Sequence, residues 1–154
     1  RSVRLPKFGD TNIAQSQGVY GYVGDLIRVA DDDVCLQMCW HLLGQGKKCK
    51  VLVCDDIETA NKWKRATEVL PLQTARTTSD KWPRACNATM QQCGGNYFGN
   101  MVEFHPKHKH AATRAFNALI GDKMFFPTLA HANNYRRQNR KAGLIVNLDG
   151  SKVE

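Results

Sequence analysis

The spacing of apolar residues predicts a helix late in the chain, between residues 112 and 119. Positions i, i+3, i+4 and i+7 of this stretch are held by Ala112, Ala115, Phe116 and Leu119. This spacing places the four side chains on one stripe, as in a helix packed on a core. Gly121 follows, where the C-terminal end of a helix favours a left-handed residue. The pattern therefore predicts a core-packed helix that ends in a turn.

Two short apolar runs on either side of a second helical stretch predict a strand–helix–strand unit. Residues 123–126 are typical of a short buried strand, which Pro127 closes. Thr128 can cap a helix that runs to about Gly143, and residues 144–148 form the next apolar run. Because a helix connects the two strands, we expect them to lie parallel in one sheet.

The first half of the chain shows a similar order of elements. A strand is predicted over residues 19–29, and a helix begins at the three aspartates 31–33, whose carboxylates suit the positive end of its dipole. The same carboxylates could bind a metal, but three consecutive side chains fan around a helix start, which favours capping. A core strand over residues 50–54 and a helix capped by Asp55 or Asp56 follow.

Composition divides the chain into four segments. Residues 1–17 lack periodicity and are interpreted as an N-terminal arm or linker, and residues 18–75 as a first lobe. Residues 76–100 are rich in Thr, Asn, Gln and Gly and are interpreted as the inter-lobe connection, with a hairpin or flexible loop at its end. Residues 101–154 form the second lobe.

Bulk composition is that of an ordinary globular protein. The 154 residues are 42% hydrophobic, with a mean hydropathy of −0.46, and no apolar run is long enough to span a bilayer. We therefore expect no membrane contact. The first residue is not Met, so the sequence is expected to be a piece of a longer protein. Cys35, Cys39 and Cys54 stand within apolar patterns, which favours free thiols in a reducing compartment over a disulfide framework.

Positive charge is concentrated in the second half of the chain. The formal net charge is +8; residues 1–77 carry 11 basic and 9 acidic residues, whereas residues 78–154 carry 11 and 5. Asp122 is the one acidic residue between Phe104 and Lys141. Such a segment favours binding to a polyanion, because each phosphate that it neutralises releases counterions. The alternative is that these cations only form the solvent-exposed outer faces of two helices.

We predict that nucleic acid is contacted by cations of the two C-terminal helices and their flanks. These residues are Lys107, Lys109, Arg114, Arg136, Arg137, Arg140 and Lys141. The last four fall at i, i+1, i+4 and i+5 and are expected to make one compact cationic face, which the first three could extend. Recognition of this kind follows the phosphate backbone and carries little sequence specificity.

Several short motifs resemble the flexible hinge domain of SMC (structural maintenance of chromosomes) proteins, over roughly residues 18 to 150. In the second half they are Leu119-Ile120-Gly121-Asp122, Leu129-Ala130-His131-Ala132 and Val146-Asn147-Leu148-Asp149-Gly150. In the first half they are the glycine-punctuated stretch 18–27, Val51-Leu52-Val53 with Ala60, and Leu70-Pro71-Leu72. Trp40-His41-Leu42 and the stretch from Phe104 to Arg136 look closest to the divergent hinges of proteins acting in chromatin silencing, RNA-directed DNA methylation and DNA repair.

The resemblance implies an α/β fold of two lobes, each a small mixed sheet covered by helices. It also implies a non-catalytic nuclear module without cofactor or metal, which forms a homodimer or a hinge–hinge heterodimer and binds DNA or RNA. Hinges of this family usually continue after the Leu-Asp-Gly turn into a glycine-rich interface strand, whereas this sequence stops at Glu154. Either that strand lies beyond Glu154, or this hinge assembles differently. Structural glycines are expected at Gly18, Gly21, Gly24, Gly121 and Gly150.

The sequence favours other chemistry less. Gly94 and Gly99 have the spacing of a phosphate-binding loop, but no Lys-Ser or Lys-Thr pair follows. A zinc site, as in a zinc-containing enzyme, could be drawn from Cys86, Cys93, His105 and His108. The six residues between the two cysteines exceed the spacing typical of zinc knuckles. A further alternative is a protein-interaction module whose basic face meets an acidic partner.

Overall fold

The computed structural model describes residues 3–4, 13, 15–75, 82–139, 145–147 and 152–153. Its helices are α2 (Val23–Leu26), α3 (Asp32–Leu42), α4 (Ile57–Trp63), α5 (Ala88–Gln92), α6 (Lys109–Leu119) and α7 (Leu129–Gln138), with 3-10 turns η1 (Lys47–Lys50), η2 (Phe98–Asn100) and η3 (Pro106–His108). Its strands are β1 (Val3–Arg4), β2 (Val19–Tyr22), β3 (Ile27–Val29), β4 (Leu52–Cys54), β5 (Val69–Pro71), β6 (Asn96–Tyr97), β7 (Val102–Phe104), β8 (Met124–Phe126), β9 (Ile145–Asn147) and β10 (Lys152–Val153).

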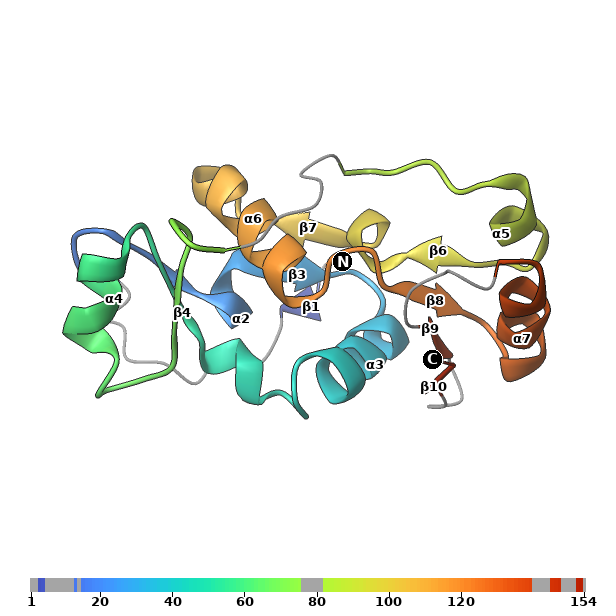
Figure 1. Cartoon of the computed structure of the whole chain (residues 1–154), viewed down its shortest axis with the longest axis horizontal. Coiled ribbons are helices and arrows are strands. Elements are labelled where there is room, and N and C mark those ends of the chain that lie inside the picture. Colours follow the sequence, from blue (N-terminus) through green and yellow to red (C-terminus); the bar gives the residue numbers. More distant parts are fainter. Residues whose placement is uncertain are drawn as a thin grey trace.

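Three small sheets form an elongated molecule, with α4 and α7 at opposite ends of the long axis (Figure 1). The strand orders are β2-β4-β5, β1-β3-β7 and β10-β9-β8-β6. The sheet with β3 and β7 lies between the other two (Figure 1). Small mixed sheets covered by helices confirm the predicted α/β class. No described helix is both long and apolar enough to pass through a bilayer.

The sheet nearest α4 is built from the first half of the chain. β4 pairs antiparallel with β2 and parallel with β5, and its three residues are all buried. α4 begins at Asp56, whose side-chain Oδ1 accepts from the Thr59 backbone N–H at 2.8 Å. This cap satisfies one of the free N–H groups at the helix start.

The sheet at the other end confirms the predicted parallel pair. β8 pairs parallel with β9, with Met124 opposite Ile145, and α7 connects the two strands. Thr128 caps α7, because its Oγ1 accepts from the His131 backbone N–H at 3.2 Å. α5 and β6, which fall in the segment interpreted as the inter-lobe connection, join this end of the molecule: β6 pairs with β8.

The middle sheet corrects one prediction. Residues 19–29 were expected to form a single strand, but the helical turn α2 interrupts them, and β3 leaves the first sheet to pair with β7. The buried residues Val23 and Leu26 belong to that turn, so its apolar sequence looks like a continued strand. β1, in the segment interpreted as an arm, pairs with the other edge of β3.

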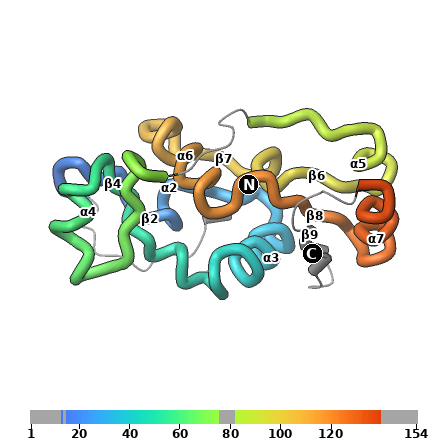
Figure 2. Tube along the Cα trace, in the orientation of Figure 1, coloured from blue at the N-terminus to red at the C-terminus, as the bar shows by residue number. Residues whose placement is uncertain are grey.

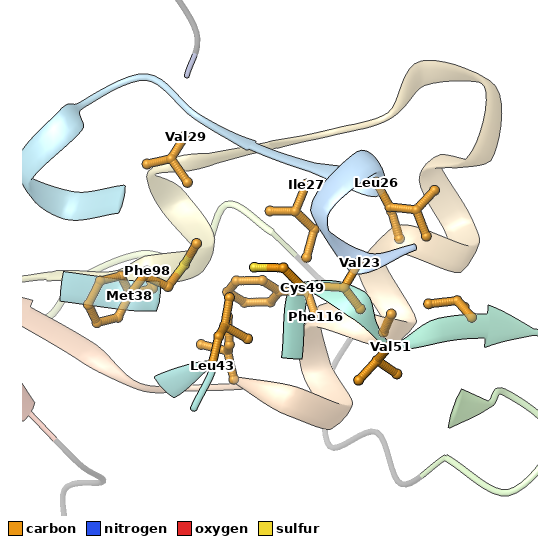
Figure 3. Packing of buried hydrophobic residues seen from close by; sticks show 14 of the residues in the cluster. Val23, Leu26, Ile27, Val29, Met38, Leu43, Cys49, Val51, Phe98 and Phe116 are labelled. Carbon is orange, nitrogen blue, oxygen red and sulfur yellow. The ribbon is translucent and has the colours of Figure 1, made fainter. Parts of the chain in front are cut away.

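The largest core cluster joins both halves of the chain. Residues of α2, β3, α3 and β4 pack with Phe98 of η2 and Phe116 of α6. Figure 3 shows Val23, Ile27 and Cys49 gathered around this centre, where all three side chains are fully buried. Residues from position 23 to position 120 therefore share one core.

Candidate nucleic-acid interface

A run of three histidines and two lysines forms η3 and the first two residues of α6. We call residues 105–110, which read His-Pro-Lys-His-Lys-His, the His–Lys segment. Its first residue caps η3, since Nδ1 of His105 accepts from the Lys107 backbone N–H at 3.2 Å. Pro106 suits the first position of the turn, where no backbone donor is needed.

The histidine rings anchor this segment to the first sheet. His108 lies edge-on to Tyr20 of β2, with ring centroids 5.6 Å apart, and His105 lies 5.6 Å from His108. The Tyr20 hydroxyl donates to Oδ1 of Asp55 at 3.1 Å. Burial lowers the pKa of His108, and the charges of His105 and Lys107 act in the same direction. His108 is therefore held toward its neutral form.

Lys107 and Lys109 are exposed cations of this segment. Within the part of the chain that the structure describes, neither forms a salt bridge, whereas Lys48 pairs with Glu68 at 2.8 Å. Unpaired exposed lysines are available to a polyanion, because no existing contact has to be broken.

Arg114 was predicted to contact nucleic acid, but its guanidinium is engaged inside the protein. The side chain is half-buried on α6, and Nη2 donates to the Leu72 backbone carbonyl at 2.6 Å. This bond joins α6 to the residue that follows β5. The geometry gives Arg114 a bracing position between distant segments.

The other predicted cations lie on or beyond α7. Arg137 is exposed, whereas Arg136 is half-buried and makes contacts of its own. Arg140 and Lys141 lie outside the described residues. α7 occupies one end of the molecule, and the beginning of α6 lies beyond its middle toward α4 (Figure 2). Lys107 and Lys109 therefore do not extend the α7 face.

The four residues of the conceivable zinc site make other contacts. The Cys86 thiol donates to Oδ1 of Asn96 at 3.2 Å, and Cys93 is buried beside α7. His108 instead packs against Tyr20, and His105 lies beside His108. Among the described residues, no three histidine, cysteine or acidic side chains converge in a way that could hold a metal ion.

The predicted structural glycines differ in their surroundings. Gly121 follows α6 with a φ of 65°, and a Cβ there would lie 3.2 Å from the Asn117 backbone oxygen. Gly18 and Gly21 also have positive φ, whereas Gly24 is buried within α2. Gly150 lies outside the described residues.

A groove beside the His–Lys segment was missed in the sequence. It runs between β7 and the stretch before α5, and its lining includes Arg28, Trp82, Pro83, Phe104, Pro106 and Lys109. These residues come from three separate stretches, so no local motif marks the groove. The available signal was compositional: aromatic, proline and basic residues mixed in the positively charged half.

No protein-family model and no curated protein matches this sequence. Solved structures do match it. A crystal structure of an asymmetric dimer of the Geobacillus stearothermophilus SMC hinge domain is 22% identical with a TM-score of 0.65, over 89% of this chain and 54% of that one. The Pyrococcus furiosus SMC hinge domain is 20% identical with a TM-score of 0.64, over 93% and 71%.

A third structure, the Pyrococcus furiosus hinge with an extended coiled coil, is 19% identical with a TM-score of 0.62, over 94% of this chain and 49% of that one. The chain thus spans about half the length of the first match. At these identities the comparison establishes the fold, which is that of an SMC hinge domain and confirms the resemblance seen in the sequence.

Proposed function

Starting from the SMC hinge fold, we propose that this chain is a non-catalytic module that dimerises and binds nucleic acid. The observation that carries nucleic-acid binding is the pair of exposed, unbridged lysines, Lys107 and Lys109, within the His–Lys segment. Arg137 and the neighbouring end of α7 provide a second, separate cationic surface.

Support for dimerisation comes from the dimeric relative and from one face of α3. Leu36 and Trp40 stand one turn apart on α3 and are 61% and 55% exposed. Exposed apolar side chains of this size mark interaction surfaces. We infer that a second copy of the chain covers them.

Charge favours this self-association. Asp32 and Asp33 are exposed at the beginning of α3, and Lys47 and Lys50 are exposed beyond its end. Two copies of α3 packed antiparallel would place the acidic end of each helix beside the basic end of the other. A two-fold interface requires this self-complementarity.

The resemblance to divergent hinges extends the proposal to a nuclear role in chromosome organisation or gene silencing, with DNA repair as a related setting. The Trp40-His41-Leu42 motif supports this part. The chains present in the same complex determine whether the module pairs with a second copy of itself or with another hinge.

Fluorescence anisotropy with DNA and RNA oligonucleotides at several salt concentrations tests nucleic-acid binding. The double variant Lys107→Glu/Lys109→Glu should weaken binding to all sequences alike, and loss of two phosphate contacts should reduce the salt slope by about 2. The matched control is Lys64→Glu/Arg65→Glu, which makes the same charge change at exposed positions after α4.

Equal weakening by both double variants would show an effect of net charge alone. Absence of binding at low salt, together with binding of an acidic protein, would favour the protein-interaction module instead. The triple variant Arg136→Glu/Arg137→Glu/Arg140→Glu measures the α7 surface separately.

Sedimentation equilibrium over a range of protein concentrations tests dimerisation. Leu36→Glu/Trp40→Glu should lower self-association, whereas Ile57→Glu/Leu129→Glu, which changes other exposed apolar residues, should not. A wild-type chain that remains monomeric at all concentrations would contradict this interface. If Leu36→Glu/Trp40→Glu still dimerises, the interface lies at the sheet edges and not on α3.

A further inference from the structure

Three thiols meet where α3 is joined to β4. Cys35 and Cys39 lie one turn apart on α3, and Cys49 belongs to η1, the turn that leads into β4. Hydrogen bonds connect the Cys39 side chain to Cys35 and to Cys49. Cys39 therefore stands between the other two thiols, and all three belong to the largest core cluster or pack against it. The proposed function uses none of them.

The turn between α3 and η1 holds Cys39 and Cys49 near each other. Gly44, Gln45 and Gly46 all have positive φ, so the chain reverses its direction within three residues. The Gly46 backbone N–H donates to the Cys39 carbonyl at 3.1 Å, and the Cys49 backbone N–H donates to the Gly46 carbonyl at 3.1 Å. Two backbone hydrogen bonds thus link the two cysteines through one glycine.

The three thiols differ in exposure. Cys49 is 0% exposed and lies within the core (Figure 3), and Cys35 is 8% exposed. Cys39 is half-buried, so a small oxidant from the solvent reaches this residue first.

The thiolate, rather than the thiol, is the reactive form of cysteine. The hydrogen bond from Cys39 lowers the pKa of the Cys49 thiol, although burial acts in the opposite direction. Because the two thiols share this hydrogen bond, the first proton lost belongs to the pair and not to one sulfur alone. The pair can therefore present a thiolate on the exposed side.

Helix geometry favours a bond between Cys39 and Cys49 over one between Cys39 and Cys35. Residues four apart on a helix have Cβ atoms about 5–6 Å apart, whereas the Cβ atoms of a disulfide are about 3.5–4.5 Å apart. A disulfide within α3 would therefore distort the helix. Cys49 approaches from a separate element and is not subject to this spacing.

We propose that Cys39 and Cys49 are a redox-sensitive pair, which hydrogen peroxide converts into a disulfide. The Cys39 thiolate takes an oxygen from peroxide, which gives a sulfenic acid and hydroxide. The Cys49 sulfur then attacks this sulfenic acid, so that the S–S bond forms, the S–O bond breaks and water leaves. Together the two thiols lose two electrons and two protons, and peroxide is reduced to two waters. The inference is independent of nucleic-acid binding and of dimerisation.

Peptide mapping after peroxide treatment tests the pair. The reduced chain is treated with hydrogen peroxide, its remaining thiols are alkylated, and it is digested with trypsin without reduction. Mass spectrometry should find the peptide that ends at Lys47 joined to the one that contains Cys49, with the loss of two hydrogens. Because the first peptide also contains Cys35, two matched variants assign the bond. Cys39→Ala should abolish the cross-link, whereas Cys35→Ala should retain it.

Thermal denaturation gives a second readout that does not depend on recovering the peptides. A disulfide that closes the short ring 39–49 should raise the melting temperature of the wild type by about 5–10 °C. A dithiol reductant should reverse this rise, and Cys39→Ala should melt alike before and after peroxide.

Three results would overturn the proposed pair. The first is a cross-link that persists in Cys39→Ala but is lost in Cys35→Ala. The second is a disulfide that joins two chains instead of forming within one. The third is oxidation of Cys39 to sulfinic acid with no cross-link and no rise in melting temperature.

Discussion

Replacing Arg114 by Met should reveal whether this residue braces the fold or binds nucleic acid. Met keeps much of the side-chain volume but removes the bond from Nη2 to the Leu72 carbonyl, which is 2.6 Å long. Leu72 is only 2% exposed, so water replaces this donor poorly. Hydrogen bonds to charged groups contribute about 1.5–3 kcal/mol, and we expect a loss of about 2 kcal/mol.

For a chain of this length, each kcal/mol shifts the melting temperature by about 2–4 °C, so Arg114→Met should lower it by about 4–8 °C. Thermal denaturation followed by circular dichroism measures this shift. Arg137→Met is the matched control: it makes the same chemical change at an exposed cation and should leave the melting temperature nearly unchanged.

Nucleic-acid affinity, measured well below both melting temperatures, separates the two roles. If Arg114 is a brace, Arg114→Met should bind oligonucleotides nearly as well as the wild type. An unchanged melting temperature combined with a loss of affinity would refute the structural argument and restore Arg114 as a phosphate contact.

Three further outcomes follow from single positions. Gly121→Val should lower the free energy of unfolding by about 1–3 kcal/mol, because a β-branched residue resists the positive φ found there. Urea titration measures this change, and an unchanged midpoint would contradict the assigned conformation of the turn. Because the pKa of His108 lies below 6.5 in the folded chain, the unfolded chain takes up the proton first, so stability should fall as the pH drops below about 6.5. His108→Gln should flatten this dependence, and an identical pH profile would count against it. Asp31→Ala removes the cap that accepts from the Asp33 and Val34 N–H groups and should cost about 1 kcal/mol by the same titration, whereas no change would show that the cap is dispensable.

Local sequence patterns predicted the helices, caps and strand pairings that depend on residues close together in the chain. The apolar stripe before Gly121 became α6, and Thr128 caps α7 as expected. The parallel pairing of β8 with β9 followed from the helix between them. These features are encoded within one turn or one connection, so a short stretch of sequence suffices to predict them.

Contacts between distant residues left no such signal. The partner of Arg114 is Leu72, 42 positions away, so a cation on a polar helix face looked available to phosphate. The groove brings together Arg28, Trp82 and Phe104 from segments with no common motif. The interruption of residues 19–29 by α2 was hidden because a buried turn and a buried strand have similar apolar composition.

The pairing of β3 with β7 has a consequence for synthesis of the chain on the ribosome. β7 emerges roughly 70 residues after β3, a delay of roughly 4–15 seconds at usual translation rates. During that interval, one edge of β3 and the apolar residues around it lack their final neighbours. An unpaired edge can pair with another nascent chain. Ribosome spacing and chaperone access should therefore affect the soluble yield of this module more than its final stability does.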